Sequence, residues 1–260
     1  MNQHVDQQEV ILRLIRERRL ILSREGGRKL YCWLKPKLES MGIKIGRDKL
    51  FDLLREKNML VYRKKRYHKT TNSMHRFYKH KNLIKEFIPN APNQLWVADI
   101  TYLSMSKGHS YLALITDAYS RKIVGYDISD SLELTGSLRA LKMALKQLPQ
   151  NHKLIHHSDR GIQYCSNAYT KVLGQNNIKI SMTQENHCYE NAMAERVNGI
   201  LKDEFYLDNC FRNKKIAKKI SENAIKLYNE QRLHLSLDYK RGCKLNSVQN
   251  VKAYYGQREQ

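Results

Sequence analysis

Three acidic residues, Asp99, Asp159 and Glu195, could carry out chemistry if the fold brings them together. Carboxylate oxygens are hard donors, and they suit Mg²⁺ or Mn²⁺ better than zinc. Two such ions, held about 4 Å apart, can clamp the attacking and the leaving oxygen of an in-line phosphoryl substitution. Water or a DNA 3′-hydroxyl can serve as the nucleophile. A converging trio therefore predicts metal-dependent cutting and joining of nucleic acid strands.

The first acid, Asp99, lies inside an apolar run at residues 95–100. A buried carboxylate without a partner is costly or becomes protonated, so a neighbouring group must compensate it. Taken alone, Asp99 also fits an edge-strand acid that faces water or bonds to Thr101. Its significance depends on the other two acids.

Asp159 follows a strand-like segment at residues 154–157, and α/β sheets place ligands at this carboxyl end of a strand. Alone, it also fits a turn or helix-cap aspartate. Glu195 lies on a predicted helix, where Asn191, Asn198 and Lys202 share its face at steps of three and four residues. Alone, it fits a surface glutamate. One acid in a strand, one after a strand and one on a helix can converge on a single site.

The elements that must position these acids follow from periodicity and turn residues. Three β-prone segments in close order predict a meander at residues 94–105, 109–118 and 121–128. The pattern then predicts a helix at residues 132–148 and a strand at 153–157. After a second helical stretch it predicts a strand at 178–182 and a long helix at 190–206. This order is typical of a ribonuclease-H-like α/β domain, although order alone leaves other α/β folds open.

The first third of the chain predicts helices, because apolar residues recur three or four apart around Ile11 and Leu34. Helical spacing resumes at residues 47–55 after Gly42 and Gly46, and this pattern is typical of a helix-turn-helix. Any small helical bundle gives the same pattern. Pro89 and Pro92 mark a break before the strands. We therefore predict a helical DNA-binding domain at residues 1–62 and a basic linker at residues 63–92. A catalytic core with a C-terminal helical extension follows at residues 93–260.

The charge of the chain is +22, with a pI of about 9.8, and it suits a polyanionic partner such as nucleic acid. Residues 1–90 carry +14 and residues 91–260 carry +8. A ribosomal or membrane-surface protein would also be positive, so charge alone selects no chemistry. The linker opens with the basic run Arg63, Lys64, Lys65 and Arg66, which is either a solvated linker or a tether on the phosphate backbone.

Other residue patterns exclude several classes of protein. The five cysteines lie far apart without a Cys-x-x-Cys pair, which predicts free thiols and, with the histidine spacing, argues against a zinc finger. No apolar run reaches the roughly 18 residues of a membrane helix, and the start of the chain is polar rather than signal-like. We therefore expect a cytoplasmic, nucleoid-associated protein.

Several motifs resemble the second-reading-frame (OrfB) transposases of the IS-three family, within the retroviral integrase superfamily. The resembling segments cover nearly the whole chain and are Trp96–Tyr102, Tyr111–Asp117, Ser120–Gly125, His157–Gly161 with Gln163 and Tyr164, and Tyr228–Asn229 with Arg232 and His234. The signature of the superfamily consists of two aspartates and a glutamate, with 35 residues between the second aspartate and the glutamate. This chain meets it, because 35 residues lie between Asp159 and Glu195. His187 and Glu190 depart from the family's Asn-Cys-Tyr-Asp-Asn-Ala segment, and a proline usual after residues 237–239 is missing.

The resemblance implies that Asp99, Asp159 and Glu195 hold two Mg²⁺ ions, with Mn²⁺ as a substitute, in a polynucleotidyl transferase. It also implies that Lys202 contacts DNA phosphate, although a solvated surface lysine fits as well. We place His157, Arg160 and Asn191 around the acids as supporting residues, where the first two could orient a metal-bound water or a phosphate.

The resulting hypothesis is a DNA transposase that nicks the terminal inverted repeats of its element and joins the freed 3′-hydroxyl to target DNA. The expected partners are these two DNAs, further copies of the chain on the DNA, and an upstream-frame segment made as a fusion. Two alternatives stay open: a related nuclease that cuts without joining, and a non-catalytic DNA-binding regulator.

Overall fold

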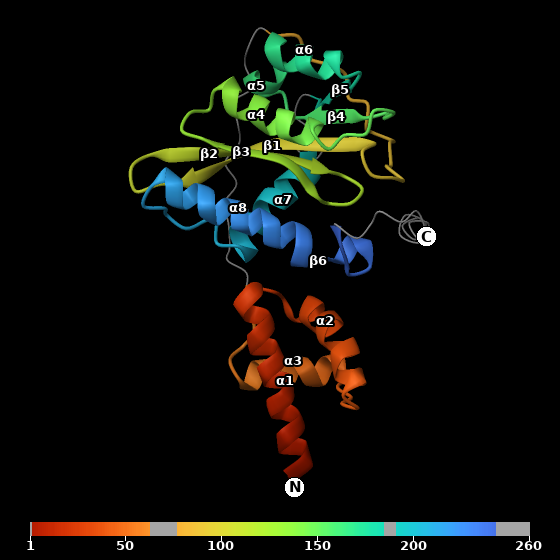
Figure 1. The fold of residues 1–260 in the computed structure, drawn as a ribbon, viewed down its shortest axis with the longest axis vertical. Helices are drawn as coiled ribbons and strands as arrows, with labels where there is room; N and C mark the ends of the chain where they lie inside the picture. Colours follow the sequence, from red (N-terminus) through yellow and green to blue (C-terminus); the bar gives the residue numbers. More distant parts are fainter. Residues whose placement is uncertain (1, 63–76, 185–190, 243–260) are drawn as a thin grey trace.

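The computed structural model describes residues 2–62, 77–184 and 191–242. It consists of a helical domain that lies below a layered α/β core (Figure 1). The helical domain contains α1 (Asn2–Ile21), α2 (Gly27–Ser40) and α3 (Arg47–Glu56). The core contains β1 (Leu95–Ser104), β2 (His109–Asp117), β3 (Ile123–Ser129), α4 (Leu134–Leu145), β4 (Ile155–Ser158), α5 (Ile162–Cys165), α6 (Asn167–Gln175), β5 (Lys179–Met182), α7 (Ala192–Glu204) and α8 (Lys214–Gln231). A short ribbon of β6 (Leu233–His234) and β7 (Lys240–Arg241) follows, with a 3-10 turn at Leu235–Leu237 between its strands.

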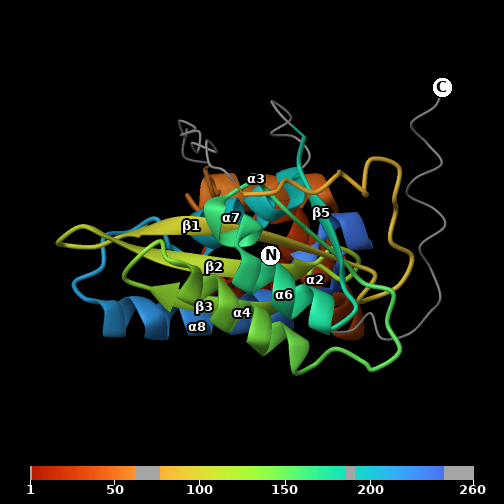
Figure 2. The same ribbon diagram turned by 90° about the horizontal axis from the view of Figure 1, so that it is seen from above.

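The core sheet has the strand order β3-β2-β1-β4-β5. β1, β2 and β3 form the predicted antiparallel meander, and β4 and β5 add to it parallel to β1. Helices α4, α5 and α6 cover one face of this sheet, and α7 and α8 cover the other (Figure 1). Seen from above, the helical domain lies behind the sheet (Figure 2). This strand order and layering confirm the predicted ribonuclease-H-like fold.

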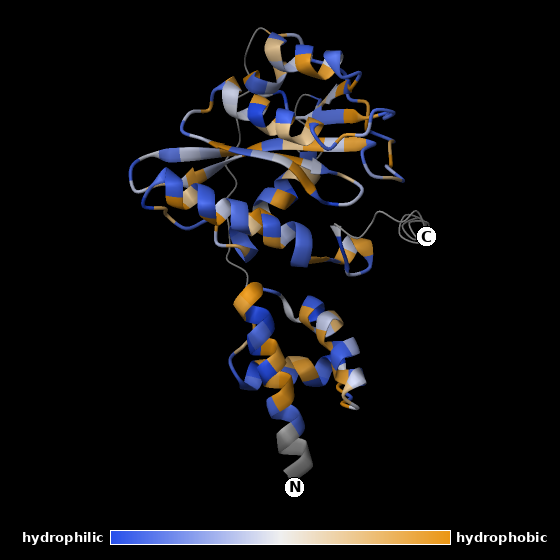
Figure 3. Ribbon diagram, in the orientation of Figure 1, coloured by the Kyte–Doolittle hydropathy of each residue, from blue (hydrophilic) through white to orange (hydrophobic). Residues whose placement is uncertain are grey.

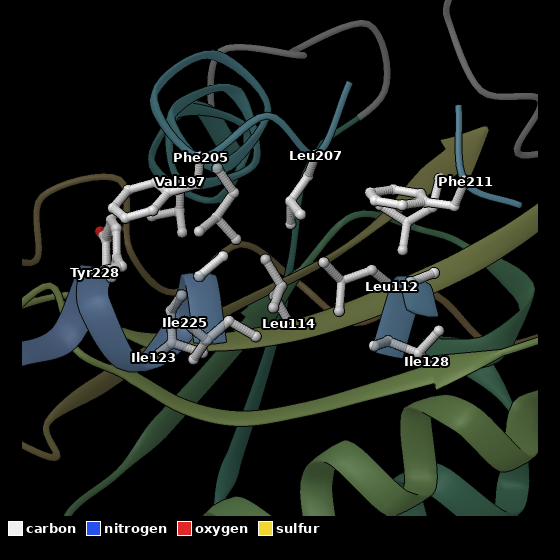
Figure 4. Close-up of a cluster of buried hydrophobic side chains, with 14 of the residues drawn as sticks. Leu112, Leu114, Ile123, Ile128, Val197, Phe205, Leu207, Phe211, Ile225 and Tyr228 are labelled. Carbon is white, nitrogen blue, oxygen red and sulfur yellow. The ribbon is translucent and has the colours of Figure 1, made fainter. Parts of the chain in front are cut away.

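Both faces of the sheet are buried because the strands alternate their apolar side chains between two cores. Toward α7 and α8, Leu112 and Leu114 of β2 face a cluster from the helices and the segment between them (Figure 4). Toward α4 and α6, Ala113 and Ile115 of the same strand pack in a second cluster that includes the fully buried Trp96. Strand β2 is therefore almost continuously buried. Figure 3 shows the same division, with apolar residues inward and polar residues on the outer helix surfaces.

The helical domain has a separate core built from residues three and four apart. Leu30, Leu34 and Leu38 of α2 are buried against the apolar faces of α1 and α3. Helix α2 ends at Ser40 and α3 begins at Arg47, so two helices flank the glycine-containing connection as predicted.

One predicted helix differs from the structure, because the stretch after β4 divides into α5 and α6. Ser166 lies between them in extended conformation, and its hydroxyl accepts a hydrogen bond from the N–H of Tyr169 at 3.3 Å. This N-cap satisfies a free donor at the start of α6, so a new helix begins there.

Candidate active site

The first two acids lie side by side on neighbouring strands. In the parallel pair of β1 and β4, Ala98 is opposite Ser158, and this is the last pair of the ladder. Asp99 is the next residue of β1, and Asp159 is the first residue after β4. Because neighbouring strands are about 4.8 Å apart, residues at the same level of a parallel pair bring their side chains close together. The strand register therefore gathers two acids that are far apart in the sequence.

Helix α7 holds the carboxylate of Asp99 in place from the side. Nδ2 of Asn198 donates to Oδ2 of Asp99 at 2.7 Å, and the N–H of Ile100 donates to Oδ1 at 2.9 Å. One strand position earlier, Nδ2 of the buried Asn191 donates to the carbonyl of Ala98 at 3.2 Å. The helix is thus fixed to β1 by two amide side chains, one at each end of the segment that contains Glu195.

Glu195 lies between these two asparagines and is exposed to solvent. Its charge reaches Asp99, whose pKa is raised to about 7. Burial is the largest cause of this shift, and the negative charge of Asp159 comes next. The hydrogen bonds from Asn198 and Ile100 lower the pKa, and the charge of Glu195 raises it further. The charges of Asp159 and Glu195 therefore both act on Asp99, and the assignment of the three acids to one metal site stays a prediction.

The turn after β4 is shaped around Asp159. Oδ1 of Asp159 accepts a hydrogen bond from the N–H of Gly161 at 2.9 Å. A Cβ atom at position 161 would lie 2.9 Å from that same oxygen, which is closer than real Cβ atoms approach. The glycine of the Asp159-Arg160-Gly161 motif thus has a steric reason, because a larger residue would push the carboxylate away.

Comparison with known proteins identifies the family of the chain. Residues 89–188 and residues 176–241 match two integrase core domain families. Transposase InsF for insertion sequence IS3A of Escherichia coli K12 is 36% identical over 153 residues, which are 58% of this chain and 53% of that protein. The 31 kDa protein of insertion element IS600 from Shigella sonnei is 40% identical over 208 residues, which are 78% of this chain and 76% of that protein. The chain belongs to the IS3-type insertion-sequence transposases. The predicted resemblance is confirmed.

The fold of this IS3-type chain is similar to that of a chain in a solved viral intasome. A subunit of the simian T-cell lymphotropic virus intasome, solved in complex with PP2A regulatory subunit B56 gamma, superposes with a TM-score of 0.51 and 16% identity. The superposition covers 88% of this chain and 76% of that chain. At this identity the likeness shows the fold alone.

Within the IS3-type core, His157 and Arg160 lie within two residues of Asp159 and have structural partners. His157 is fully buried in β4, with Nδ1 2.9 Å from the hydroxyl of Ser181. Nε of Arg160 donates to the carbonyl of Thr183 at 2.6 Å. Lys202 is half-buried in the last turn of α7, and Arg63 to Arg66 lie outside the described residues. Roles for these residues in positioning water, phosphate or DNA stay predictions.

Asn198 is the site residue whose direct role sequence reasoning missed. The sequence predicts that Asn198 shares a helix face with Glu195, three residues earlier. Only the structure shows its 2.7 Å hydrogen bond to Asp99. Tyr164 was also missed as a neighbour of the acids. It is fully buried, and its pKa is raised well above the usual value by burial, by Tyr169 and by the charges of Asp99 and Asp159.

Two negative findings concern only the described residues. Among them, no three His, Cys, Asp or Glu side chains form a group close enough to hold a metal ion as they stand. Likewise, none of the helices within residues 2–62, 77–184 and 191–242 has the length and apolar character needed to cross a membrane.

Proposed function

We propose that this chain is a transposase that nicks the ends of its insertion sequence and joins the freed 3′-hydroxyl to target DNA. Asp99, Asp159 and Glu195 carry the chemistry in this proposal. The observation that supports it most is the raised pKa of Asp99, which reflects burial together with two further acids directed at the same place. A buried acid whose pKa is raised by neighbouring acids is typical of catalytic sites, and such an arrangement is unfavourable in a purely structural role.

The three acids fit a site for divalent metal ions. A half-buried carboxylate near two other carboxylates needs a proton or a cation to offset the repulsion, and three hard oxygen donors favour Mg²⁺, with Mn²⁺ as a substitute. Asp99, Asp159 and Glu195 would be the protein ligands of two such ions. When bound, the ions would supply Lewis-acid activation of the attacking and the leaving oxygen of an in-line phosphoryl substitution.

The role of the surrounding residues is to hold the acids ready. The amide of Asn198 and the N–H of Ile100 orient the Asp99 carboxylate, and the N–H of Gly161 orients Asp159. Asn191 fixes the start of α7 against β1. Such preorganised groups need little rearrangement during the reaction, which is where much catalytic power comes from.

The DNA partners follow from the charge of +22 and from the relatives. InsF is named as a transposase for an insertion sequence, and the viral relative is a subunit of an intasome. We propose that residues 1–62 bind the terminal inverted repeats, that the basic linker and Lys202 contact phosphates, and that several copies of the chain act together on DNA. An upstream-frame fusion partner and a nucleoid-associated, cytoplasmic location belong to the same proposal.

A strand-transfer assay tests this function. The protein is incubated with Mg²⁺, a target plasmid and either an intact or a pre-nicked terminal-repeat duplex, and nicked and joined products are measured. Asp159→Asn and Glu195→Gln are expected to abolish joining and nicking while DNA binding and fold are kept. Asp130→Asn serves as the control, because Asp130 is an exposed acid paired with Lys214. Full activity of either site variant would refute the assignment, and nicking without joining would indicate a nuclease.

A further inference from the structure

A buried group of three charges connects the helical domain to the core. Glu204, the last residue of α7, receives hydrogen bonds from Nζ of Lys29 at 2.8 and 2.9 Å. It also receives two from Arg232, at 2.9 Å from Nε and 2.8 Å from Nη2. The side chains of Lys29 and Arg232 are only 8% and 6% exposed. Because Lys29 belongs to α2 and Arg232 follows α8, one carboxylate joins three helices at the domain boundary (Figure 1).

Residues of α1 and its C-terminal end add a second set of contacts to the same boundary. Arg18 is buried, forms two hydrogen bonds with Glu25 at 2.7 and 2.9 Å, and donates to the carbonyl of Gln231 at 2.9 Å. Leu22, which directly follows α1, is 5% exposed and packs in the core cluster of α7 and α8. An apolar anchor and a charged network therefore both fix the helical domain to the catalytic core.

The charges of Lys29, Glu204 and Arg232 favour a single placement of the helical domain on the core. Burial alone would raise the pKa of Glu204, but the hydrogen bonds and charges of Arg232 and Lys29 outweigh it and lower the pKa to about 2. The pKa of Lys29 is lowered by burial and by Arg232, and Glu204 opposes this shift. Separating the domain would remove Lys29, one of the two partners of Glu204, and would expose the apolar side chain of Leu22. Removal of one member of a buried ion pair is strongly unfavourable.

The same helix contains a proposed catalytic acid and the docking carboxylate. Glu195 and Glu204 are nine residues apart on α7, which is about 13 Å along a rigid helix at roughly 1.5 Å per residue. At the other end of α2, the connection to α3 forms an open groove whose lining includes Lys35, Lys44, Arg47 and Lys49 together with the acids Glu39 and Asp48. This groove and helix α7 are thus connected through helices that pack at the domain boundary.

We propose that the Lys29–Glu204–Arg232 group fixes the spacing between the DNA sequence bound by the helical domain and the phosphodiester that is cut. Glu204 is a positioning residue in this scheme and does not touch DNA. The inference rests on the proposed function, since it assigns cutting to the core and end binding to the helical domain. Its consequence is that docking defines which phosphodiester reaches Asp99, Asp159 and Glu195.

Position-resolved cutting of end-labelled terminal-repeat duplex in Mg²⁺ tests the proposal. Lys29→Met removes the cation at similar length, and Leu22→Ala weakens the same boundary without changing a charge. Both variants are expected to bind the duplex as wild type does. Their cuts should spread to neighbouring phosphodiesters, and the rate at the normal position should fall on the order of 100-fold, as expected for misplacement by an ångström or more. Lys29→Arg should restore the single cut.

The matched control is Lys142→Met, which removes an exposed lysine from α4 on the opposite face of the sheet. Melting curves verify that each variant is folded, and Leu22→Ala decides the question if Lys29→Met fails to fold. A single wild-type cut position in folded Lys29→Met and Leu22→Ala would overturn the proposal. A uniform loss of cutting without displacement and with an unchanged footprint would overturn it too.

Hydroxyl-radical footprinting without divalent metal separates this inference from the proposed function. Wild type should protect both the sequence bound by the helical domain and the DNA near the cut, whereas Lys29→Met should keep the first protection and lose the second. If wild type cuts no DNA, the proposed function fails while this footprint still tests the docking. Identical footprints of wild type and Lys29→Met would count against fixed spacing.

Discussion

Replacement of Asp99 by asparagine should stabilise the metal-free protein at neutral and alkaline pH while it abolishes activity. The reason is the pKa of Asp99, which is about 7 in the folded chain and has an ordinary value of 3.8. Folding therefore raises the affinity of this carboxyl for its proton. Below about pH 4 the group is protonated in both states and has no effect. As the pH rises from 4 to 7, the folded chain loses stability, and above pH 7 the full penalty is present.

The size of this penalty follows from the two pKa values, 3.8 and about 7. At ~1.4 kcal/mol per pH unit, the difference corresponds to an upper value of ~4 kcal/mol. Asparagine keeps one acceptor oxygen for the two donors, Asn198 and Ile100, so one hydrogen bond worth ~1 kcal/mol is lost. The net gain for Asp99→Asn at pH 8 is then ~3 kcal/mol, which is several degrees in melting temperature for a chain of this size.

Thermal unfolding in EDTA at pH 4 and pH 8 measures this effect. Asp99→Asn should melt higher than wild type at pH 8, and the order should reverse slightly at pH 4. Addition of Mg²⁺ at pH 8 should raise the melting temperature of wild type and leave the variant nearly unchanged. Equal or lower stability of Asp99→Asn at pH 8 would show that burial and the neighbouring acids do not penalise the carboxylate, and the argument for the site would fail.

Three further substitutions separate structure from chemistry. Asp117→Ala should lower stability by ~2 kcal/mol, because it leaves the two Ser120 donors, now 2.8 and 2.6 Å from Oδ2 of Asp117, without an acceptor; strand transfer per folded molecule should persist, and its loss would give Asp117 a catalytic role. Gly161→Ala should reduce strand transfer ~100-fold with little change in melting temperature, because the new Cβ would displace the Asp159 carboxylate; unchanged activity would contradict that steric reading. Gly125→Ala should destabilise by ~1–3 kcal/mol in a urea titration, because its Cβ would meet the backbone of α4, and a smaller loss would mean that the helix can move away.

Much of the core could be predicted from the sequence because its signals are local. The alternation and turn residues of the meander, and the placement of Asp159 directly after a strand, each depend on a few neighbouring residues. The predicted strands agree with β1, β2 and β3 to within two residues at each end. The pairing of the strand that contains Asp99 with the strand before Asp159 could be predicted, because element order restricts which strands become neighbours.

The remaining features depend on contacts between residues far apart in the chain. Such contacts produce no periodic pattern in the sequence from which they could be predicted. The bond from Asn198 to Asp99 requires the depth and rotation of α7 on the sheet. The burial of Lys29 could not be expected from a lysine in the first turn of a helix, because its partner Glu204 is 175 residues away. The predicted domain boundaries at residues 62 and 92 stay predictions, although Ile84 of the linker packs against the core.

The position of β1 in the middle of the sheet has a consequence for local unfolding. This strand is bonded to β2 on one side and to β4 on the other, so its backbone amides should be among the last to exchange with deuterium. Asp99 is thus held by the most protected segment, whereas Glu195 stands on a helix at the surface and Asp159 in a turn. If the core opens in stages, Asp99 keeps its place longest, and the other two acids return to it on refolding.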